Sequence, residues 1–276
     1  MVSVLFFYAN NRQLLFEYAL DCLERIELWK QCEKIVCSDG PTKFRRDGYK
    51  VIEVTRPRRD YNWAAVWQAG VEAASHEYLW YLDCDRIVPV NYLTEALKLL
   101  KPKEWVYPRN TLRLTQVLGV IDLMKVQDGY NRHFVGEVEP RVDNPPSTVT
   151  SQPGKNPFSG NALFTKTEFL ASGGLNPAFD GYGYADIDYY QKMHQLGQKF
   201  VICPLDEYHE WHTHAVDNER DRKMMYYNGF MYCKNWNLRP HDMLIGNCLR
   251  HGIRFQDVKA NTRFCNSVYD KALRML

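Results

Sequence analysis

Short apolar runs rich in β-formers alternate with helical patterns through the first 100 residues, and this alternation is the strongest constraint on the fold. Four segments are typical of strands: residues 2–8, 34–39, 50–55 and 77–83. Residues 62–74 and the segment after Asn91 have the pattern of helices. The run EYLWYLD at 77–83 is typical of a strand buried on both faces. Strands alternating with helices predict an α/β fold with a mostly parallel central sheet flanked by helices.

The second half of the chain has a weaker pattern. EWVYPRNTLRL at 104–114 predicts one strand, and the Pro-, Ser- and Gly-rich residues 143–157 indicate a long loop. Further strands are predicted at 161–165 and 199–205, and helices closed by glycine at 166–174 and 185–197. From about residue 217 the pattern is mostly helical. We therefore expect a domain over 1–216, with halves 1–100 and 101–216, and a helical C-terminal extension over 217–276.

Composition excludes several protein classes. The 276 residues are 45% hydrophobic and 25% charged, which is typical of globular proteins, and the formal charge of +2 gives no sign of a polyanion-coating protein. No segment approaches the roughly 18 apolar residues of a membrane span, and the N-terminus lacks signal-peptide features, so we expect a cytoplasmic protein. The eight cysteines are scattered without a CxxC pair, which argues against a zinc ribbon or a disulfide framework. The 14% aromatic content suits either a site for a ring-shaped ligand or aromatic packing.

Asp83-Cys84-Asp85 follows the most apolar predicted strand. Ligands of open α/β sheets bind beyond the carboxyl ends of the strands. Two carboxylates on an irregular turn can share a hard cation, which can in turn hold a diphosphate. The alternative is that these acidic residues only end the strand or cap the next helix.

A more specific pattern lies in residues 156–190, NPFSGNALFTKTEFLASGGLNPAFDGYGYADIDYY. It is similar to the segment F-x-G-x-x-A-L-x-K-x-x-F-L, G-(F/L), G-W-G-x-E-D-x-D of β-1,4-galactosyltransferases and chondroitin polymerases. The matching residues are Phe158, Gly160, Lys166, Phe169, Leu170, Gly174, Gly181, Gly183, Asp186 and Asp188.

The N-terminal half carries the other motifs of the same family in the expected order. Tyr8, Asn11 and Arg12 follow the first predicted strand, Asp39 follows the second, and the D-x-D triplet comes later. Over about residues 3–215 the chain resembles the GT-A glycosyltransferases of families 2 and 7, whose fold is that of nucleotide-diphospho-sugar transferases.

The resemblance implies a donor site in the first half. Asp39 would hydrogen-bond the edge of uracil or another base, unless it only caps a turn. Tyr8, Asn11 and Arg12 would line the base and phosphate pocket. Asp83 would reach the ribose or a water molecule on the metal.

The resemblance also implies a metal site. Asp85 would bind Mn²⁺ or Mg²⁺ directly, since oxygen ligands and a diphosphate suit hard cations. A histidine after the strand at 199–205 would be a further ligand, and YHEWHTH offers His209, His212 and His214. His209 matches best and His212 second, while the alternative is that these are solvated loop histidines.

The catalytic base of such enzymes corresponds to Asp186. A carboxylate near the acceptor hydroxyl can take its proton, and the N-terminus of a helix favours the ionised form. Asp186 could instead be only a helix cap. Tyr182 and Tyr184 would stack on the acceptor, unless they serve ordinary packing, and Asp188 would contact the acceptor or orient a neighbour. Ala185 departs from the pattern, because relatives carry an acceptor-binding Glu there.

These residues together predict a metal-dependent inverting glycosyltransferase that transfers a hexose from a UDP-sugar to an acceptor hydroxyl. The acceptor is a glycan or, given the basic C-terminal residues and the altered acceptor positions, a hydroxylated base in DNA. Ala185 motivates an alternative, a catalytically silent module with the same fold that binds nucleotide sugars or glycans. A nucleotidyltransferase is disfavoured because no G-x-x-x-x-G-K loop is present.

Overall fold

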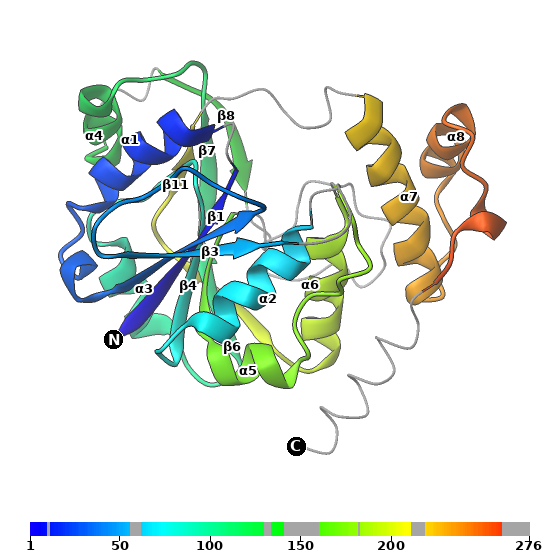
Figure 1. Ribbon diagram of the computed structural model, residues 1–276, viewed down its shortest axis with the longest axis horizontal. Coiled ribbons are helices and arrows are strands. Elements are labelled where there is room, and N and C mark those ends of the chain that lie inside the picture. Colours follow the sequence, from blue (N-terminus) through cyan, green and yellow to red (C-terminus); the bar gives the residue numbers. More distant parts are fainter. Residues whose placement is uncertain are drawn as a thin grey trace.

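The computed structural model describes residues 1–9, 12–55, 62–129, 134–140, 160–181, 183–210 and 219–260. Its main sheet has seven strands in the order β10-β6-β9-β4-β1-β2-β3 (Figure 1). Their bounds are β1 Val2–Tyr8, β2 Glu33–Asp39, β3 Tyr49–Val54, β4 Tyr78–Asp83, β6 Glu104–Pro108, β9 Asn161–Thr165 and β10 Lys199–Cys203. Neighbouring strands pair in parallel except at β9, which runs antiparallel to β4 and β6. The mostly parallel sheet predicted from the sequence is thus confirmed.

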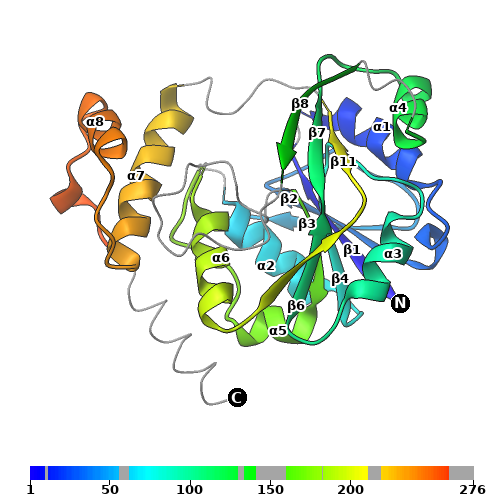
Figure 2. The ribbon, with the colours of Figure 1, turned by 180° about the vertical axis from the view of Figure 1, so that it is seen from behind.

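Helices cover both faces of this sheet (Figures 1 and 2). They are α1 Gln13–Leu23, α2 Trp63–Ala73, α3 Tyr92–Leu99, α5 Lys166–Ala171 and α6 Ala185–Gln195. Because side chains alternate along a strand, Leu5 and Phe7 of β1 pack with α2, α5 and α6. Val4 and Phe6 point the other way and pack with α1 and α3. Both faces of β1 are therefore buried, as its continuous apolar sequence predicts.

Aromatic side chains fill the core beneath α2, α5 and α6. The rings of Trp105 and Phe164 stack with centroids 4.0 Å apart, and Trp67 stacks on the same Phe164 at 5.6 Å. Tyr81 lies 3.8 Å from Trp67, and all of these side chains are buried. Much of the aromatic content of the described residues therefore serves packing.

A second, four-stranded sheet has the order β5-β11-β7-β8. Its strands are β5 Arg86–Ile87, β11 Glu207–His209, β7 Asn110–Leu114 and β8 Val135–Pro140. Helices α1 and α4 (Val120–Gln127) pack on it through an apolar cluster that includes Cys22, Leu123 and Tyr208. The single strand predicted over 104–114 is wrong, because the chain leaves the main sheet at Arg109 and β7 continues in the second sheet. The segment has β-forming side chains in both strands, and its sequence does not mark this change of sheet.

The C-terminal residues that the structure describes are mostly helical, with α7 at Glu219–Asn235, α8 at Asp242–Arg250 and a 3₁₀ turn at Phe255–Asp257. Phe230 and Met231 of α7 belong to the same apolar cluster as α6, so α7 extends the core of the main sheet. Figure 1 shows α7 and α8 side by side at one end of the molecule. Among the described residues, no helix has the length and apolar character needed to cross a membrane.

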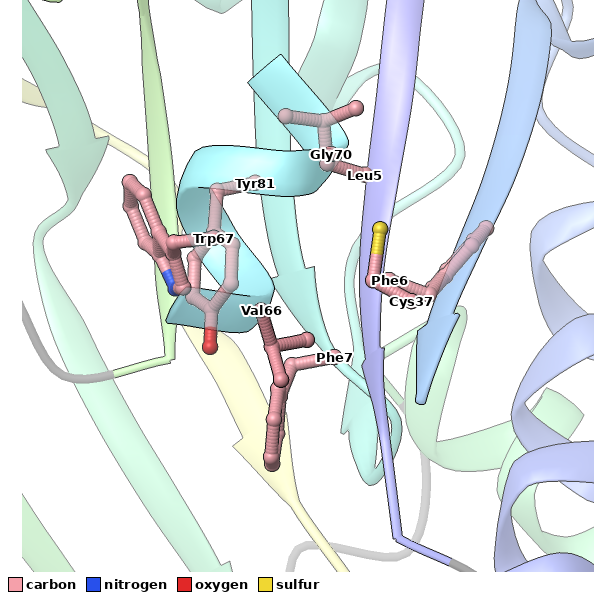
Figure 3. A pocket seen from close by; sticks show the side chains of 8 residues that line it. All are labelled: Leu5, Phe6, Phe7, Cys37, Val66, Trp67, Gly70 and Tyr81. Atoms are coloured by element: carbon pink, nitrogen blue, oxygen red, sulfur yellow. The ribbon is translucent and has the colours of Figure 1, made fainter. Parts of the chain in front are cut away.

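A cavity of about 10 Å³ lies where α2 packs on the main sheet (Figure 3). Its lining residues are Leu5, Phe6, Phe7, Cys37, Val66, Trp67, Gly70 and Tyr81. A water molecule needs roughly 10–15 Å³ and several polar partners, so this cavity is a small packing gap rather than a ligand site. The seven cysteines of the described residues are all free and buried, in keeping with the absence of a disulfide framework.

Gly70 allows α2 to approach β2 closely, and its replacement tests this contact. A Cβ at Gly70 would lie 2.7 Å from Sγ of Cys37. We expect Gly70→Ala to lower the free energy of unfolding by about 1–3 kcal/mol through overpacking, measured by urea titration.

Two further variants control this experiment. Combining Gly70→Ala with Cys37→Ala removes the clashing sulfur, so the loss for the pair should be smaller than the sum of the two single losses. Gly246→Ala, in α8 with nothing within 4 Å of the added Cβ, should instead stabilise by about 0.4–1 kcal/mol. Equal losses at Gly70 and Gly246 would contradict the close-packing argument.

Candidate active site

The site lies at the carboxyl ends of β1 and β4. These strands are neighbours in the sheet, and Phe7 of β1 pairs with Asp83 of β4. From β1 the chain continues to β2 and β3 on one side, whereas β4 and β9 lie on the other side. Strand order therefore reverses between β1 and β4, and ligands of open α/β sheets bind at such a switch point. Asp83 ends β4, so the D-x-D turn projects from this position.

Pairing in the second sheet brings the D-x-D turn to His209. The turn leads directly into β5, and β5 pairs antiparallel with β11 so that Arg86 lies opposite His209. The backbone N–H of Glu210 also donates to the carbonyl oxygen of Asp85 at 3.0 Å. As a result, Nε2 of His209 lies 3.6 Å from Oδ2 of Asp85.

This pair of side chains has the donor atoms of a divalent-cation site. Metal–ligand distances of roughly 2.0–2.2 Å allow two donors of one ion to lie up to about 4.3 Å apart, and the 3.6 Å separation of Asp85 and His209 falls within that limit. Within the described residues no group of three His, Cys, Asp or Glu side chains could hold a metal, so the pair needs further ligands. His212 and His214 lie outside the described residues.

Two arginines offset the negative charge of the D-x-D turn. The guanidinium of Arg12 hydrogen-bonds Oδ2 of Asp85, the oxygen nearest His209. The guanidinium of Arg86 lies 3.5 Å from Oδ1 of Asp85 and 3.8 Å from Oδ2 of Asp83. Arg12 therefore lies beside the D-x-D turn, and its contact with the donor phosphates stays a prediction.

Asp83 is the accessible carboxylate of the turn. Its side chain is 23% exposed, whereas that of Asp85 is 1% exposed. The hydroxyl of Tyr81 donates to Oδ1 of Asp83. Burial and the neighbouring Asp85 carboxylate raise the pKa of Asp83 above its usual value, and Arg86 opposes this change.

Glu210 is a site residue that the sequence reasoning missed. Its carboxylate is buried, and neither oxygen has a hydrogen-bond partner among the described residues. Burial, and then the charge of Asp85, raise the pKa of Glu210 well above its usual value. The only signal in the sequence was its position beside His209.

Asp39 is the last residue of β2, and its contact with the donor base stays a prediction. One of its carboxylate oxygens accepts from the backbone N–H of Asn62 at 2.8 Å. Asn62 also caps α2 through Ala65, and its side chain donates to Oδ1 of Asp180 at 3.0 Å. Asn62 therefore ties the end of β2 to the glycine-rich loop before α6.

Tyr8 does not line an open pocket. Its side chain is 1% exposed, and its ring packs against Phe16 and Phe44 with centroids 5.2 and 5.6 Å away. The expectation that Tyr8 contacts the donor base needs correction, because β1 directs this ring into the core beneath α1. Asn11 lies outside the described residues.

Helix α6 presents Asp186 in its first turn. Oδ1 of Asp186 accepts from the backbone N–H of Ile187 at 2.9 Å, and the residue is partly exposed. A carboxylate at this position is favoured in its ionised form by the helix dipole. Asp186 is the second residue of α6, which has Tyr184 at its N-cap and no side-chain capping bond, so the cap alternative does not describe it. Its role as a base stays a prediction.

Tyr184, just before α6, packs under α7. Its backbone is left-handed (φ 67°), its ring lies 5.7 Å from that of Tyr232, and a Cβ on Gly229 would lie only 2.9 Å from it. Burial raises the pKa of Tyr184 to about 12. The packing alternative therefore describes this ring, and Tyr182 lies outside the described residues.

Asp188 is fully buried and anchors α7. Its Oδ1 accepts from Nε1 of Trp236 at 2.8 Å. Such a carboxylate does not reach an acceptor directly, so its predicted acceptor contact needs correction. The other interpretation of Asp188, as a residue that orients a neighbour, fits this geometry.

Asn228 of α7 holds the loop before α6 and was missed by the sequence reasoning. Its side-chain amide donates to the carbonyl oxygens of Asp180 at 2.8 Å and Gly183 at 3.1 Å. Asn228 is buried, so both bonds are shielded from water. Helix α7 thereby fixes the backbone on which Asp186 is presented.

Comparison with known proteins identifies the fold of this chain. A sequence model of glycosyl transferase family 2 matches residues 8–108. The crystal structure of GalNAc-T7 with UDP, GalNAc and Mn²⁺ superposes with a TM-score of 0.59 at 14% identity, covering 86% of this chain and 49% of that one. This chain has the GT-A glycosyltransferase fold. The expected fold is thus confirmed, and the D-x-D turn lies at the switch point of a GT-A sheet.

Other comparisons add less. A Drosophila β-1,4-galactosyltransferase 7 in complex with manganese, UDP-Gal and xylobiose matches with a TM-score of 0.43 at 13% identity, covering 73% of this chain and 64% of that one. No curated protein matches this GT-A chain. The chain spans about half the length of GalNAc-T7.

The burial of Asp188 predicts a pH effect on stability. Burial raises the pKa of Asp188 from 3.8 to about 6, so folding favours the protonated carboxyl. This contribution to stability is present below about pH 4 and is lost as the pH rises through 6. Asp188→Asn keeps an oxygen for Trp236 and does not ionise. Relative to wild type, its free energy of unfolding should therefore improve by up to about 3 kcal/mol between pH 4 and 7.

Urea unfolding at a series of pH values measures this difference. Asp122→Asn, at an exposed carboxylate of α4, is the matched control and should show a much smaller change. A difference between Asp188→Asn and wild type that stays constant from pH 4 to 7 would contradict the burial of an ionisable group here.

Proposed function

We propose that this GT-A protein is a metal-dependent inverting glycosyltransferase that moves a hexose from a UDP-sugar to an acceptor hydroxyl. The observation that carries the proposal is the pairing of Asp85 with His209 at the switch point, 3.6 Å apart and next to the partly exposed Asp83. GalNAc-T7, which shares the fold, was solved with UDP and Mn²⁺, and this supports the donor and the metal.

In this proposal Asp85 and His209 hold the Mn²⁺ ion. The ion, when bound, stabilises the negative charge of the departing UDP as a Lewis acid. His209 is only 8% exposed and Asp85 1%, so both ligands are held in place by the protein around them. Asp83 remains accessible for the ribose, and Asp39 at the end of β2 is assigned to the base.

Arg12 is assigned to the donor diphosphate. Its guanidinium lies at Asp85 and its side chain is 26% exposed, so it can face a ligand in the switch-point crevice. The planar fork of a guanidinium suits two phosphate oxygens at once. In this role it offsets the negative charge of the diphosphate.

Asp186 is assigned as the general base. An inverting transfer is a single displacement at the anomeric carbon, so one carboxylate must take the proton of the acceptor hydroxyl as the new bond forms. The N-terminus of α6 favours the ionised form of Asp186, and Asn228 holds the preceding loop. No second nucleophilic carboxylate is required for this stereochemistry.

The test is a panel of UDP-, GDP- and dTDP-sugars with Mn²⁺, in which release of nucleoside diphosphate is measured. We expect release from a UDP-sugar that stops on chelation of the metal and is abolished by Asp85→Ala. His209→Ala should weaken Mn²⁺ binding. Asp186→Asn should lower kcat by about 10²–10⁴-fold while donor binding, measured by calorimetry, is unchanged.

The activity, the stereochemistry and the silent-module alternative each have their own control or contrary outcome. Asp122→Asn, on the surface of α4, should retain full activity. NMR of the product at early times should show an inverted anomeric centre, and retention would contradict the role of Asp186. Donor binding with no turnover in wild type would favour the catalytically silent module instead.

A further inference from the structure

Arg86 is a buried cation directly after the D-x-D turn, at the start of β5. Its guanidinium faces three carboxylates, at 3.2 Å from Glu207, 3.5 Å from Asp85 and 3.8 Å from Asp83. Arg86 is 5% exposed, and an arginine keeps its charge in proteins. Such a charge is costly in the interior unless it is paired, and the fully buried Glu207 provides the nearest partner.

Glu207 is held by hydrogen bonds from two other strands. Its Oε1 accepts from the hydroxyl of Thr111 in β7 at 2.7 Å. Its Oε2 accepts from the amide of Asn161 in β9 at 2.9 Å, and Asn161 in turn accepts from Nε1 of Trp80 in β4 at 2.8 Å. All four side chains are buried, so the network links both sheets to the guanidinium of Arg86.

The backbone is also shaped around Arg86. Gly160 has a left-handed backbone (φ 93°), and a Cβ at this position would clash with the guanidinium. The carbonyl oxygen of Gly160 accepts from the backbone N–H of Asp83 at 2.8 Å, so this contact lies directly beside the D-x-D turn. The guanidinium therefore fills a space that is closed on one side by backbone and on the other by Glu207.

We propose that Arg86 is a positioning residue of the metal and donor site. Glu207 and the Gly160 backbone fix the guanidinium of Arg86, which in turn orients the carboxylates of Asp83 and Asp85. This inference rests on the proposed function, since it concerns the same site. Arg86 itself contacts the two carboxylates and acts through them.

A purely electrostatic role for Arg86 predicts the opposite effect on metal binding. A positive charge beside Asp85 repels a divalent cation, so removing it would tighten Mn²⁺ binding if charge alone mattered. If Arg86 positions the ligands, its removal loosens them, and partners of metal ligands typically contribute 10–100-fold in affinity. The sign of the change separates the two roles.

The experiment measures binding of Mn²⁺ alone, without nucleotide, by electron paramagnetic resonance of the free ion. The main variant is the double change Arg86→Met with Glu207→Gln, which removes both members of the buried ion pair and so avoids leaving one charge uncompensated. We expect Mn²⁺ binding to weaken by about 10–100-fold in a folded protein. Arg86→Lys, which keeps the charge but loses the planar fork, should not restore wild-type affinity.

Arg109→Met is the matched control, because Arg109 makes a surface ion pair with Asp206 at 2.9 Å in the same region. It should leave Mn²⁺ affinity unchanged. Circular dichroism and thermal unfolding verify that each variant is folded. In the double variant and in Arg86→Lys, but not in Arg109→Met, kcat of sugar transfer should fall while the KM of the acceptor stays near the wild-type value.

The failures are distinguishable. Wild-type or tighter Mn²⁺ binding in the double variant, or full rescue by Arg86→Lys, overturns the positioning role and leaves the proposed function intact. Wild-type protein that binds no Mn²⁺ overturns the proposed function, and the inference with it.

Discussion

The pairing of β5 with β11 is the contact on which the site depends. These are the shortest strands of the second sheet, yet their antiparallel register places Arg86 opposite His209. Without this ladder, the D-x-D turn and the histidine would have no fixed relation, because a long stretch of chain separates them. The main sheet alone supplies the switch point and Asp83, whereas the junction of the two sheets supplies the pair of Asp85 and His209.

The same junction concentrates charge in a poorly solvated place. The carboxylates of Asp85, Glu207 and Glu210 are each at most 2% exposed. Arg86 contacts the first two, and the charge of Asp85 adds to burial in raising the pKa of Glu210. Unpaired charges are costly in such surroundings, so geometry and charge balance constrain each other here. Arg12 and Arg86 offset only part of the carboxylate charge at this junction.

The sequence predicted the main sheet well because its strands have strong local patterns. The apolar runs at 2–8 and 77–83 each form a strand within a residue of the predicted bounds. Motif matching also selected Asp85 and His209, which the structure brings together. The second sheet was missed because a two-residue strand such as β5 has no periodicity. Its pairing with β11 joins distant parts of the chain, which local sequence patterns do not reveal.

The misplaced site residues have physical reasons of the same kind. Tyr8 follows Val4 and Phe6 on alternate positions of β1, so the strand period already assigned its ring to the core face. The prediction for Tyr8 followed the motif resemblance instead of the strand period. Asp188 lies at a position of α6 that faces α7, and the sequence gives no indication that Trp236 would cover it.

The loop before α6 depends on contacts with α7, so the C-terminal helices and the main domain share a packed interface. Gly181 and Gly183 both have positive φ, and as glycines they give the loop before Asp186 a wide choice of backbone conformations. Asn228 of α7 binds two of its carbonyl oxygens, and methionines of the same helix lie where a Cβ on either glycine would be. A division at residue 216 therefore separates the loop before α6 from the helix that holds it. Because that helix replaces loop flexibility with fixed contacts, changes in α7 would alter the position of Asp186 without touching any reacting atom.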